Sequence, residues 1–244
     1  MTNKTVKPYL NEPGSKKEQV TQMFNRISGS YDLLNRMLSL GIDVHWRKVL
    51  VGKLRKAKPV QVLDVATGTA DLALAIAEAV PSAHVTGLDI AEEMLVIGRS
   101  KIAKRGLDNR IRLEAGDAER LPYPDGTFDA ITVAFGVRNF EDLEQGLGEM
   151  YRVLRPGGRL YVLEFAQPKG WFFRPIFQLY FKYLLPLVGR LTSKDARAYQ
   201  YLFESVQAFP EGETFLELMR KKGFEQTGWT SLTFGTCAIY EGSH

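Results

Sequence analysis

The chain has 244 residues, of which 45% are hydrophobic and 25% are charged. This composition excludes a disordered polymer, and the length fits one α/β domain with an additional lobe. The formal net charge of +4 is too small to favour nucleic acid as the partner, and ordinary surface lysines account for it equally well. The single cysteine, Cys237, excludes an internal disulfide. Because the N-terminus lacks a secretory segment and no apolar run is long enough to span a bilayer, we expect a cytoplasmic protein.

Two helices are predicted before residue 59. Apolar residues recur at helical spacing between positions 20 and 27, and Ser28-Gly29-Ser30 is expected to interrupt that helix. A second helix should end before Pro59, because the residue that precedes a proline is pushed out of the α region. We expect residues 1–58 to form a helical segment that caps the substrate, and residues 59–244 to form the main domain.

Short apolar runs alternate with amphipathic helices from residue 60 onward. The predicted strands cover residues 60–66, 84–90, 110–115, 128–135, 158–166, 224–232 and 234–241. The predicted helices between them cover residues 70–80, 91–105, 141–154 and 211–222. This order predicts a doubly wound α/β fold with a mainly parallel, seven-stranded, Rossmann-like sheet. The last two strands are separated by too few residues for a crossover, so they should form an antiparallel hairpin.

The segment 170–205 departs from this alternation. Aromatic residues, among them Phe173 and Phe177, recur at helical spacing in its first part, and Arg174 and Lys182 belong to a polar stripe on another face. This pattern predicts a helical insert between the fifth strand and the last helix.

Residues 60–71 have the pattern of a strand, a tight turn and the start of a helix. Gly68 lets the chain turn sharply and lets a ligand approach the backbone, and the following helix N-terminus offers unpaired N–H groups. Asp89 follows Gly68 at roughly the twenty-residue distance expected of a carboxylate that binds ribose hydroxyls. The three-glycine fingerprint of dinucleotide-binding proteins is missing. The stretch therefore favours a nucleoside ligand without a pyrophosphate, such as S-adenosylmethionine.

Each candidate ligand-binding carboxylate has a structural alternative. Asp64, at the end of the first strand, can face the ammonium group of S-adenosylmethionine, and Thr69 offers a hydroxyl and an N–H. Alternatively, Asp64 and Asp71 only hold the turn. Asp89 can accept both ribose hydroxyls, or it can cap the helix that follows it. Asp117, after the third strand, suits the exocyclic amine of adenine.

The fourth strand ends at Arg138 and Asn139. Ligands of open α/β sheets bind outside the carboxyl ends of the strands, so these two side chains should lie near the reacting group. A structural ion pair is the alternative for Arg138.

These motifs together resemble those of class I S-adenosylmethionine-dependent methyltransferases, and specifically of the ubiquinone/menaquinone biosynthesis C-methyltransferase family. The resemblance to the class rests on residues 63–69, Asp89 and Asp117-Ala118. The resemblance to the specific family rests on three further stretches, which are Tyr31 to Arg47, Phe135 to Asn139, and Arg152 to Phe165.

The resemblance implies that Thr69, Asp89, Asp117 and Ala118 contact the cofactor, S-adenosylmethionine. Ala134 stands where some relatives have a serine that contacts the cofactor, and it has no hydroxyl to offer.

The resemblance also implies methylation of a ring carbon of a reduced polyprenyl quinone, without a metal. The sequence Thr69-Ala70-Asp71 looks more like the menaquinone branch of the family, which converts demethylmenaquinol to menaquinol. A benzoquinol precursor of ubiquinone is the alternative substrate, and members that accept both also exist.

The expected site has to stabilise a developing phenolate and to remove a proton. Arg138 suits the first task because a guanidinium group stays charged and donates several hydrogen bonds. Asn139 and Tyr31 can donate further hydrogen bonds to a quinol oxygen. His45 is a candidate base because imidazole titrates near neutrality, although a histidine beside Trp46 is also a plausible structural residue.

The aromatic face of 171–185 can line a tunnel for the prenyl tail or lie in the membrane interface, and a helical lid with ordinary surface cations is the alternative. The sequence leaves self-association into a homo-oligomer open. Three rival functions are a dinucleotide-dependent oxidoreductase, a non-catalytic quinone-binding module and a nucleic-acid methyltransferase. The single glycine opposes the first, the intact cofactor loop opposes the second, and the modest charge opposes the third.

Overall fold

The computed structural model of the chain describes residues 6–10, 12–168 and 196–244. Most of the insert predicted at 170–205, including the aromatic face of 171–185 with Arg174 and Lys182, lies outside the described residues. The last part of the predicted insert forms the beginning of a helix, Ala196–Ala208 (α8). None of the helices within the described ranges is long and apolar enough to cross a membrane.

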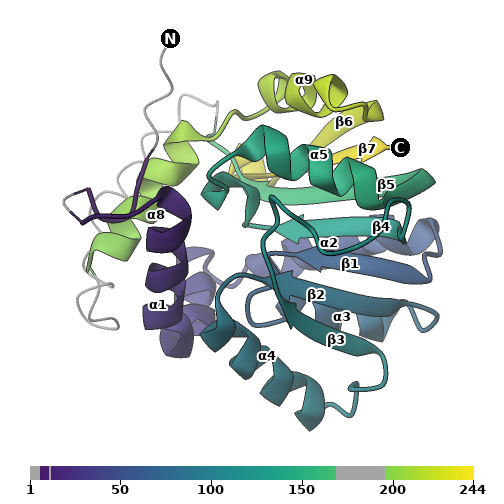
Figure 1. Cartoon of the computed structure of the whole chain (residues 1–244), viewed down its shortest axis with the longest axis horizontal. Helices are drawn as coiled ribbons and strands as arrows, with labels where there is room; N and C mark the ends of the chain where they lie inside the picture. Colours follow the sequence, from purple (N-terminus) through teal and green to yellow (C-terminus); the bar gives the residue numbers. More distant parts are fainter. Residues whose placement is uncertain (1–5, 11, 169–195) are drawn as a thin grey trace.

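Within the described residues, one seven-stranded sheet has the order β3-β2-β1-β4-β5-β7-β6 (Figure 1). The strands are β1 Gln61–Val65, β2 His84–Asp89, β3 Ile111–Ala115, β4 Phe128–Ala134, β5 Leu154–Phe165, β6 Glu225–Leu232 and β7 Cys237–Ser243. Strands β1 to β5 pair in parallel, whereas β7 is antiparallel to both β5 and β6. The predicted doubly wound sheet with its C-terminal hairpin is therefore confirmed. Its strand order reverses between β1 and β4, where ligands of such sheets bind.

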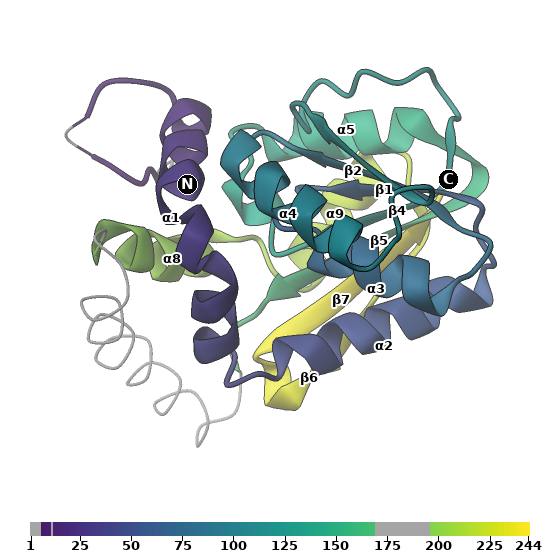
Figure 2. The ribbon, with the colours of Figure 1, turned by 90° about the horizontal axis from the view of Figure 1, so that it is seen from below.

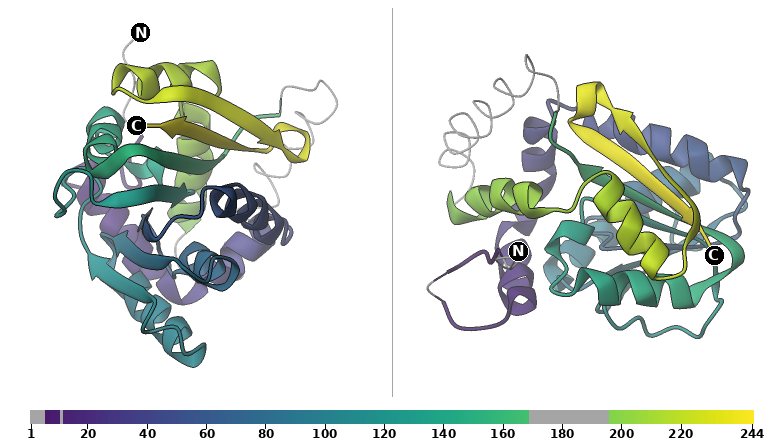
Figure 3. Two further views of the ribbon diagram at one scale, coloured as in Figure 1. Left: turned by 90° about the vertical axis from the view of Figure 1, so that its right-hand side faces the viewer. Right: turned by 90° about the horizontal axis from the view of Figure 1, so that it is seen from above.

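Helices cover both faces of the sheet. They are α1 Lys16–Leu38, α2 Asp43–Lys56, α3 Asp71–Ala79, α4 Glu92–Lys104, α5 Leu143–Val153 and α9 Glu213–Lys221, besides α8. Figures 2 and 3 show α2 and α3 on one side of the strands and α5 on the other. Two separate apolar clusters match these layers, one containing residues of α2, α3 and α4 and the other residues of α5 and α9.

The alternation of side chains along the central strands explains why there are two clusters. Neighbouring residues of a strand point to opposite faces of the sheet. On β1, Val62 belongs to the first cluster and Leu63 to the second, and both are completely buried. Ala130 and Ile131 on β4 divide in the same way. Both faces of these strands are therefore apolar, as a sheet covered on two sides requires.

A third cluster holds α1 against α8 at one end of the sheet (Figure 1). Its buried members are Tyr9, Val20, Met23, Ile27, Ala198 and Tyr201. Helix α8 also contacts the short 3-10 turn Val137–Asn139 (η1), which follows β4. The two helices therefore stand over the carboxyl end of β4.

Three predicted boundaries were wrong. Helix α1 continues through 28–30, where the hydroxyls of Ser28 and Ser30 donate to the carbonyls of Asn25 and Ile27, because tertiary contacts hold α1 on both sides of this point. Strand β5 begins at Leu154, since this residue pairs with Phe128 before a shift of register. The last strand begins only at Cys237, because a 3-10 turn, Thr233–Gly235 (η3), makes the hairpin connection.

Candidate active site

The turn after β1 has an unusual backbone. Ala66, Gly68 and Ala70 all have positive φ values, of 53°, 56° and 65°, and non-glycine residues rarely adopt this conformation. Asp64 lies beneath the turn, where it accepts hydrogen bonds from the hydroxyls of Thr67 at 2.6 Å and Thr132 at 2.7 Å. Asp64 therefore ties the turn to β4, as the structural alternative expected. Burial raises the pKa of this carboxyl to about 6, although both hydroxyls act to lower it.

Asp89 lies beside the same turn at the end of β2. Its Oδ2 accepts a hydrogen bond from the N–H of Gly68 at 2.8 Å, and its Oδ1 accepts from the N–H of Ala91 at 2.9 Å. Burial raises the pKa of Asp89, and the backbone hydrogen bonds oppose this shift. The two N–H donors fix the orientation of the carboxylate, and each oxygen retains a lone pair for a further donor.

A first hollow opens in front of this turn, and its lining is mainly apolar with a few polar groups, as is common for small-ligand sites. Apolar walls come from Leu88, Ile90 and Met94. The predicted site residues that line it are Tyr31, Gly68, Asp89, Asp117, Ala118, Ala134 and Asn139. The structure thus brings the ends of β1, β2, β3 and β4 together around one hollow.

Lys17 of α1 lines the first hollow and pairs with two carboxylates. Its Nζ lies 2.7 Å from Oδ2 of Asp117 and 2.8 Å from Oε2 of Glu119. Burial opposes the charge of Lys17, but the hydrogen bonds to the two carboxylates raise its pKa above the usual value. Neither Lys17 nor Glu119 was predicted as a site residue, because nothing in their spacing separates them from surface charges.

A second hollow lies next to the first and shares Phe24, Tyr31 and Asn139 with it. Its other lining residues are Met23, Ile27, Asn35, Arg138, Ala198, Tyr201 and Leu202. Most of these side chains are apolar and come from α1 and α8. Arg138 and Asn139 of η1 and Asn35 of α1 supply polar groups to its wall, and Asn139 also lines the first hollow.

Arg138 is buried, and hydrogen bonds to Glu164 and Phe135 hold its guanidinium group in place. Its Nη1 donates to Oε1 of Glu164 at 2.6 Å and to the carbonyl of Phe135 at 2.5 Å. Its guanidinium carbon lies 5.4 Å from the centre of the Phe165 ring. Nζ of Lys16 also donates to the carbonyl of Arg138 at 3.1 Å, which fastens α1 to η1. Arg138 therefore makes the ion pair that was the structural alternative, and it also lines the second hollow.

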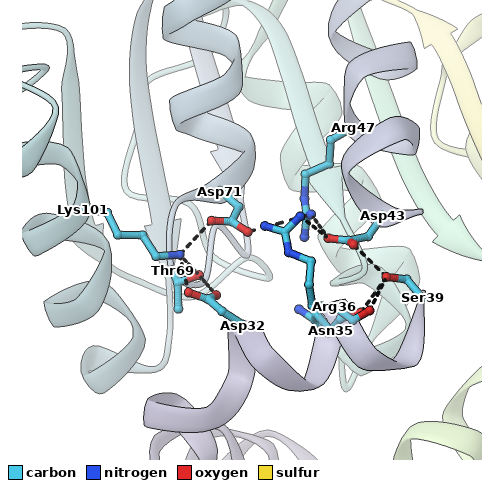
Figure 4. Close-up of polar contacts among 9 residues, drawn as sticks. All are labelled: Asp32, Asn35, Arg36, Ser39, Asp43, Arg47, Thr69, Asp71 and Lys101. Carbon is cyan, nitrogen blue, oxygen red and sulfur yellow. Dashed lines mark hydrogen bonds and ion pairs between the residues drawn. The ribbon is translucent and has the colours of Figure 1, made fainter. Parts of the chain in front are cut away.

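Thr69 does not line the first hollow but joins the cofactor turn to α1 (Figure 4). Its hydroxyl donates to Oδ1 of Asp32 at 2.6 Å and accepts from Nζ of Lys101 at 2.9 Å. Lys101 also lies 2.5 Å from Asp32 and 2.7 Å from Asp71. We call these four side chains the latch. The latch connects α1, the turn, α3 and α4.

The polar contacts continue from the latch into α2 (Figure 4). Arg47 lies 3.9 Å from Asp71 and is hydrogen-bonded to Asp43. The hydroxyl of Ser39 donates to Asp43 at 2.7 Å, and Arg36 lies 3.8 Å from the same carboxylate. Most polar members of the family-like stretch Tyr31 to Arg47 thus hold the two N-terminal helices to the cofactor turn.

His45 is a predicted site residue that the structure places outside both hollows. It is exposed on α2 and belongs to the lining of neither hollow. The neighbouring Trp46 is buried, and its Nε1 donates to the hydroxyl of Thr233 at 2.8 Å. Glu164 and Tyr201 were not predicted as site residues. Glu164 lies in the stretch Arg152 to Phe165, on which the family resemblance partly rests, but only the fold shows that it pairs with Arg138.

The first hollow fits S-adenosylmethionine. Asp89 presents a carboxylate oriented by two N–H donors, Gly68 brings the backbone close to the hollow, and Leu88, Ile90 and Met94 form apolar walls. With the strand order of the sheet, these features define a class I S-adenosylmethionine-dependent methyltransferase.

Comparison with known proteins gives the family. Residues 13–244 match the model of the ubiE/COQ5 methyltransferase family, and the chain belongs to this family. Demethylmenaquinone methyltransferase of Bacteroides fragilis is 46% identical over 235 residues, which cover 96% of each chain. The ubiquinone/menaquinone biosynthesis C-methyltransferase UbiE of Geobacter sulfurreducens is 46% identical over 93% of this chain and 89% of its own. The [4+2]-cyclase SpnF shares the fold, with a TM-score of 0.67 and 19% identity over 93% of this chain and 96% of its own.

Proposed function

We propose that the protein methylates a ring carbon of demethylmenaquinol and so forms menaquinol. The observation that carries the proposal is the second hollow, which is mainly apolar, adjoins the first and contains the buried Arg138. A hydrophobic quinol ring fits such a wall, and a guanidinium suits its ionised oxygen. The name of the Bacteroides fragilis relative also supports this substrate.

In this proposal, the residues of the first hollow hold the cofactor. Asp89 accepts the ribose hydroxyls, Asp117 and Ala118 lie at the adenine, and Gly68 and Ala134 bring backbone and a small side chain near the methionine part. Asp64 and Thr69 support the cofactor site indirectly, by fixing the turn. Asp64 does so through its hydrogen bond with Thr132, and Thr69 does so through the latch. S-adenosylmethionine supplies an electrophilic methyl group when it is bound.

The residues of the second hollow make the ring carbon nucleophilic. Arg138 lowers the pKa of a nearby phenolic hydroxyl by favouring its ionised form, and the charge then spreads into the ring. Tyr31 and Asn139 lie at the junction of the hollows, where they can orient the ring toward the methyl group. The reaction replaces a ring hydrogen by a methyl group and releases one proton. His45 has no part in this mechanism, because it is exposed outside both hollows.

A polyprenyl benzoquinol is the second candidate substrate. The name of the Geobacter sulfurreducens relative includes ubiquinone biosynthesis, and an apolar wall accepts a benzoquinol as readily as a naphthoquinol. The segment 1–58 would cap either substrate, with α1 as the part that covers the ring.

The test uses labelled S-adenosylmethionine with a short-chain demethylmenaquinol, 2-geranyl-1,4-naphthoquinol, or with the matching benzoquinol, both kept reduced. We expect label in the naphthoquinol product, identified by mass spectrometry as methylated on the ring carbon. The oxidised quinone is the control and should not react, since its ring carbon is electrophilic. Label in the benzoquinol alone would move the function to the ubiquinone pathway, and label in neither would refute both.

A further inference from the structure

Among the described side chains, three buried polar atoms have no hydrogen-bond partner. They are Nε of Arg138, Oε2 of Glu164 and the hydroxyl of Tyr201. A buried polar group without a partner costs free energy, so proteins rarely retain one without a reason. The three residues belong together, because Arg138 pairs with Glu164 and shares the wall of the second hollow with Tyr201.

The ring of Tyr201 is well held, and only its hydroxyl is left over. Tyr201 is 1% exposed on α8 and belongs to the apolar cluster with Met23 and Ile27 of α1. Tyr240 is just as buried, but its hydroxyl accepts a hydrogen bond from the N–H of Gly212 at 2.8 Å. A phenylalanine would fill the space of the Tyr201 ring equally well. The hydroxyl has no partner among the described residues, and a bound ligand can supply one.

We propose that the hydroxyl of Tyr201 donates a hydrogen bond to one oxygen of the quinol in the second hollow. This inference rests on the proposed function and adds a substrate-binding residue to it. Burial raises the pKa of Tyr201, so the hydroxyl stays protonated at neutral pH and remains a donor. Such a bond strengthens as negative charge develops on the quinol oxygen, and Tyr201 then assists Arg138.

The first test is Tyr201→Phe. Removal of an unsatisfied buried hydroxyl should leave the melting temperature unchanged or raise it. The same change should lower kcat/KM for the quinol by roughly ten- to a hundredfold, as expected for a hydrogen bond to a charged group, and leave the Kd of S-adenosylmethionine unchanged. Tyr240→Phe is the matched control and should do the reverse, lowering the melting temperature without a change in kcat/KM. Wild-type kcat/KM in Tyr201→Phe would overturn the inference and would mean that only water meets the hydroxyl.

The second test measures ligand binding and needs no turnover. Two ligands that each lack one of the quinol hydroxyls, 2-geranyl-1-naphthol and 3-geranyl-1-naphthol, are compared on the complex with S-adenosylhomocysteine. Tyr201→Phe should weaken the binding of one of them and leave the other unaffected, because only one retains the oxygen that Tyr201 contacts. Equal Kd values of wild type and variant for both ligands would overturn the inference. If wild type binds the ligands in this way but methylates no quinol, the proposed function fails while the contact stands.

Discussion

Nη1 of Arg138 lies 2.6 Å from Oε1 of Glu164, and the two side chains are only 4% and 0% exposed. Breaking such a pair leaves an unpaired buried charge, which typically costs about 3–5 kcal/mol, whereas replacing both partners by apolar residues is often neutral. Burial raises the pKa of Glu164 and the charge of Arg138 opposes this shift, so the carboxylate depends on its partner. The pair therefore offers a way to separate the role of Arg138 in stability from its role in catalysis.

Arg138→Ala is expected to reduce turnover by roughly a hundredfold or more, because a donor to the developing phenolate is lost. It should also reduce the free energy of unfolding, as measured by urea titration. The double variant Arg138→Leu/Glu164→Leu should recover much of that free energy but none of the turnover. Recovery of activity in the double variant would show that Arg138 serves only the fold.

Lys101→Met tests the latch. The change leaves the carboxylates of Asp32 and Asp71 without their shared cation, and two like charges then face each other. We expect weaker binding of S-adenosylmethionine, by about tenfold in Kd, and faster amide hydrogen exchange in α1. Lys104→Met on the same helix is the control, since Lys104 is exposed, and it should change neither quantity. An unchanged Kd in Lys101→Met would separate the latch from cofactor binding.

The affinity for S-adenosylmethionine should depend on pH through Asp64, whose pKa is raised to about 6 by burial. The cofactor brings positive charge and favours the ionised carboxylate, so binding should release a proton below pH 6. The Kd should therefore increase about tenfold for each pH unit below 6, as measured by calorimetry. Asp64→Asn should bind more weakly and should depend less steeply on pH over the same range, since Asp89, whose pKa is also raised by burial, remains. A flat profile in the wild type would mean that Asp64 acts only on the turn.

The same raised pKa has an effect of opposite sign on stability. Between the ordinary pKa of 3.8 and about 6, the folded protein binds more protons at Asp64 than the unfolded chain does. The contribution of Asp64 to the free energy of unfolding should therefore fall as pH rises through this window. Denaturant midpoints of wild type and Asp64→Asn, compared at pH 4.5 and pH 7, check the sign.

Ala134→Ser should improve cofactor binding. Ala134 lines the first hollow at the end of β4 and offers no side-chain donor or acceptor. A hydroxyl there could form one hydrogen bond with the cofactor, worth about 1 kcal/mol or roughly a fivefold lower Kd. Ala75→Ser, on the partly buried side of α3, is a control for the added hydroxyl alone. A higher Kd in Ala134→Ser would mean that the cofactor lies too close to Ala134 to leave room for a hydroxyl.

The strands, the helices and the residues at the strand ends could be predicted from the sequence, because each depends on a pattern of residues that are close together in the chain. Alternating apolar runs specified the sheet, and the spacing from Gly68 to Asp89 identified two strand ends that meet at one hollow. Arg138 and Asn139 followed from their place after β4. Each of these inferences needs only the rule that parallel strands end at the same edge.

The remaining features depend on distances that no local pattern contains. Glu164 pairs with Arg138 across two neighbouring strand ends, and Tyr201 reaches the same place from α8. The break predicted at 28–30 was wrong for a related reason. Serine and glycine favour turns only when tertiary contacts do not determine the backbone conformation. Here the cluster with α8 holds α1 on one side of this point, and the hydrogen bond of Asp32 holds it on the other.

The cluster of Tyr9, Val20 and Ile27 with Ala198 and Tyr201 joins α1 to α8, two helices that are far apart in the sequence. During synthesis, the apolar face of α1 emerges first, but the residues of α8 that cover it emerge only after β1 to β5. The closure of such a long loop is slow, since its entropy is lost before the contact forms. The parallel strands β1 to β5 can therefore pair before the second hollow exists.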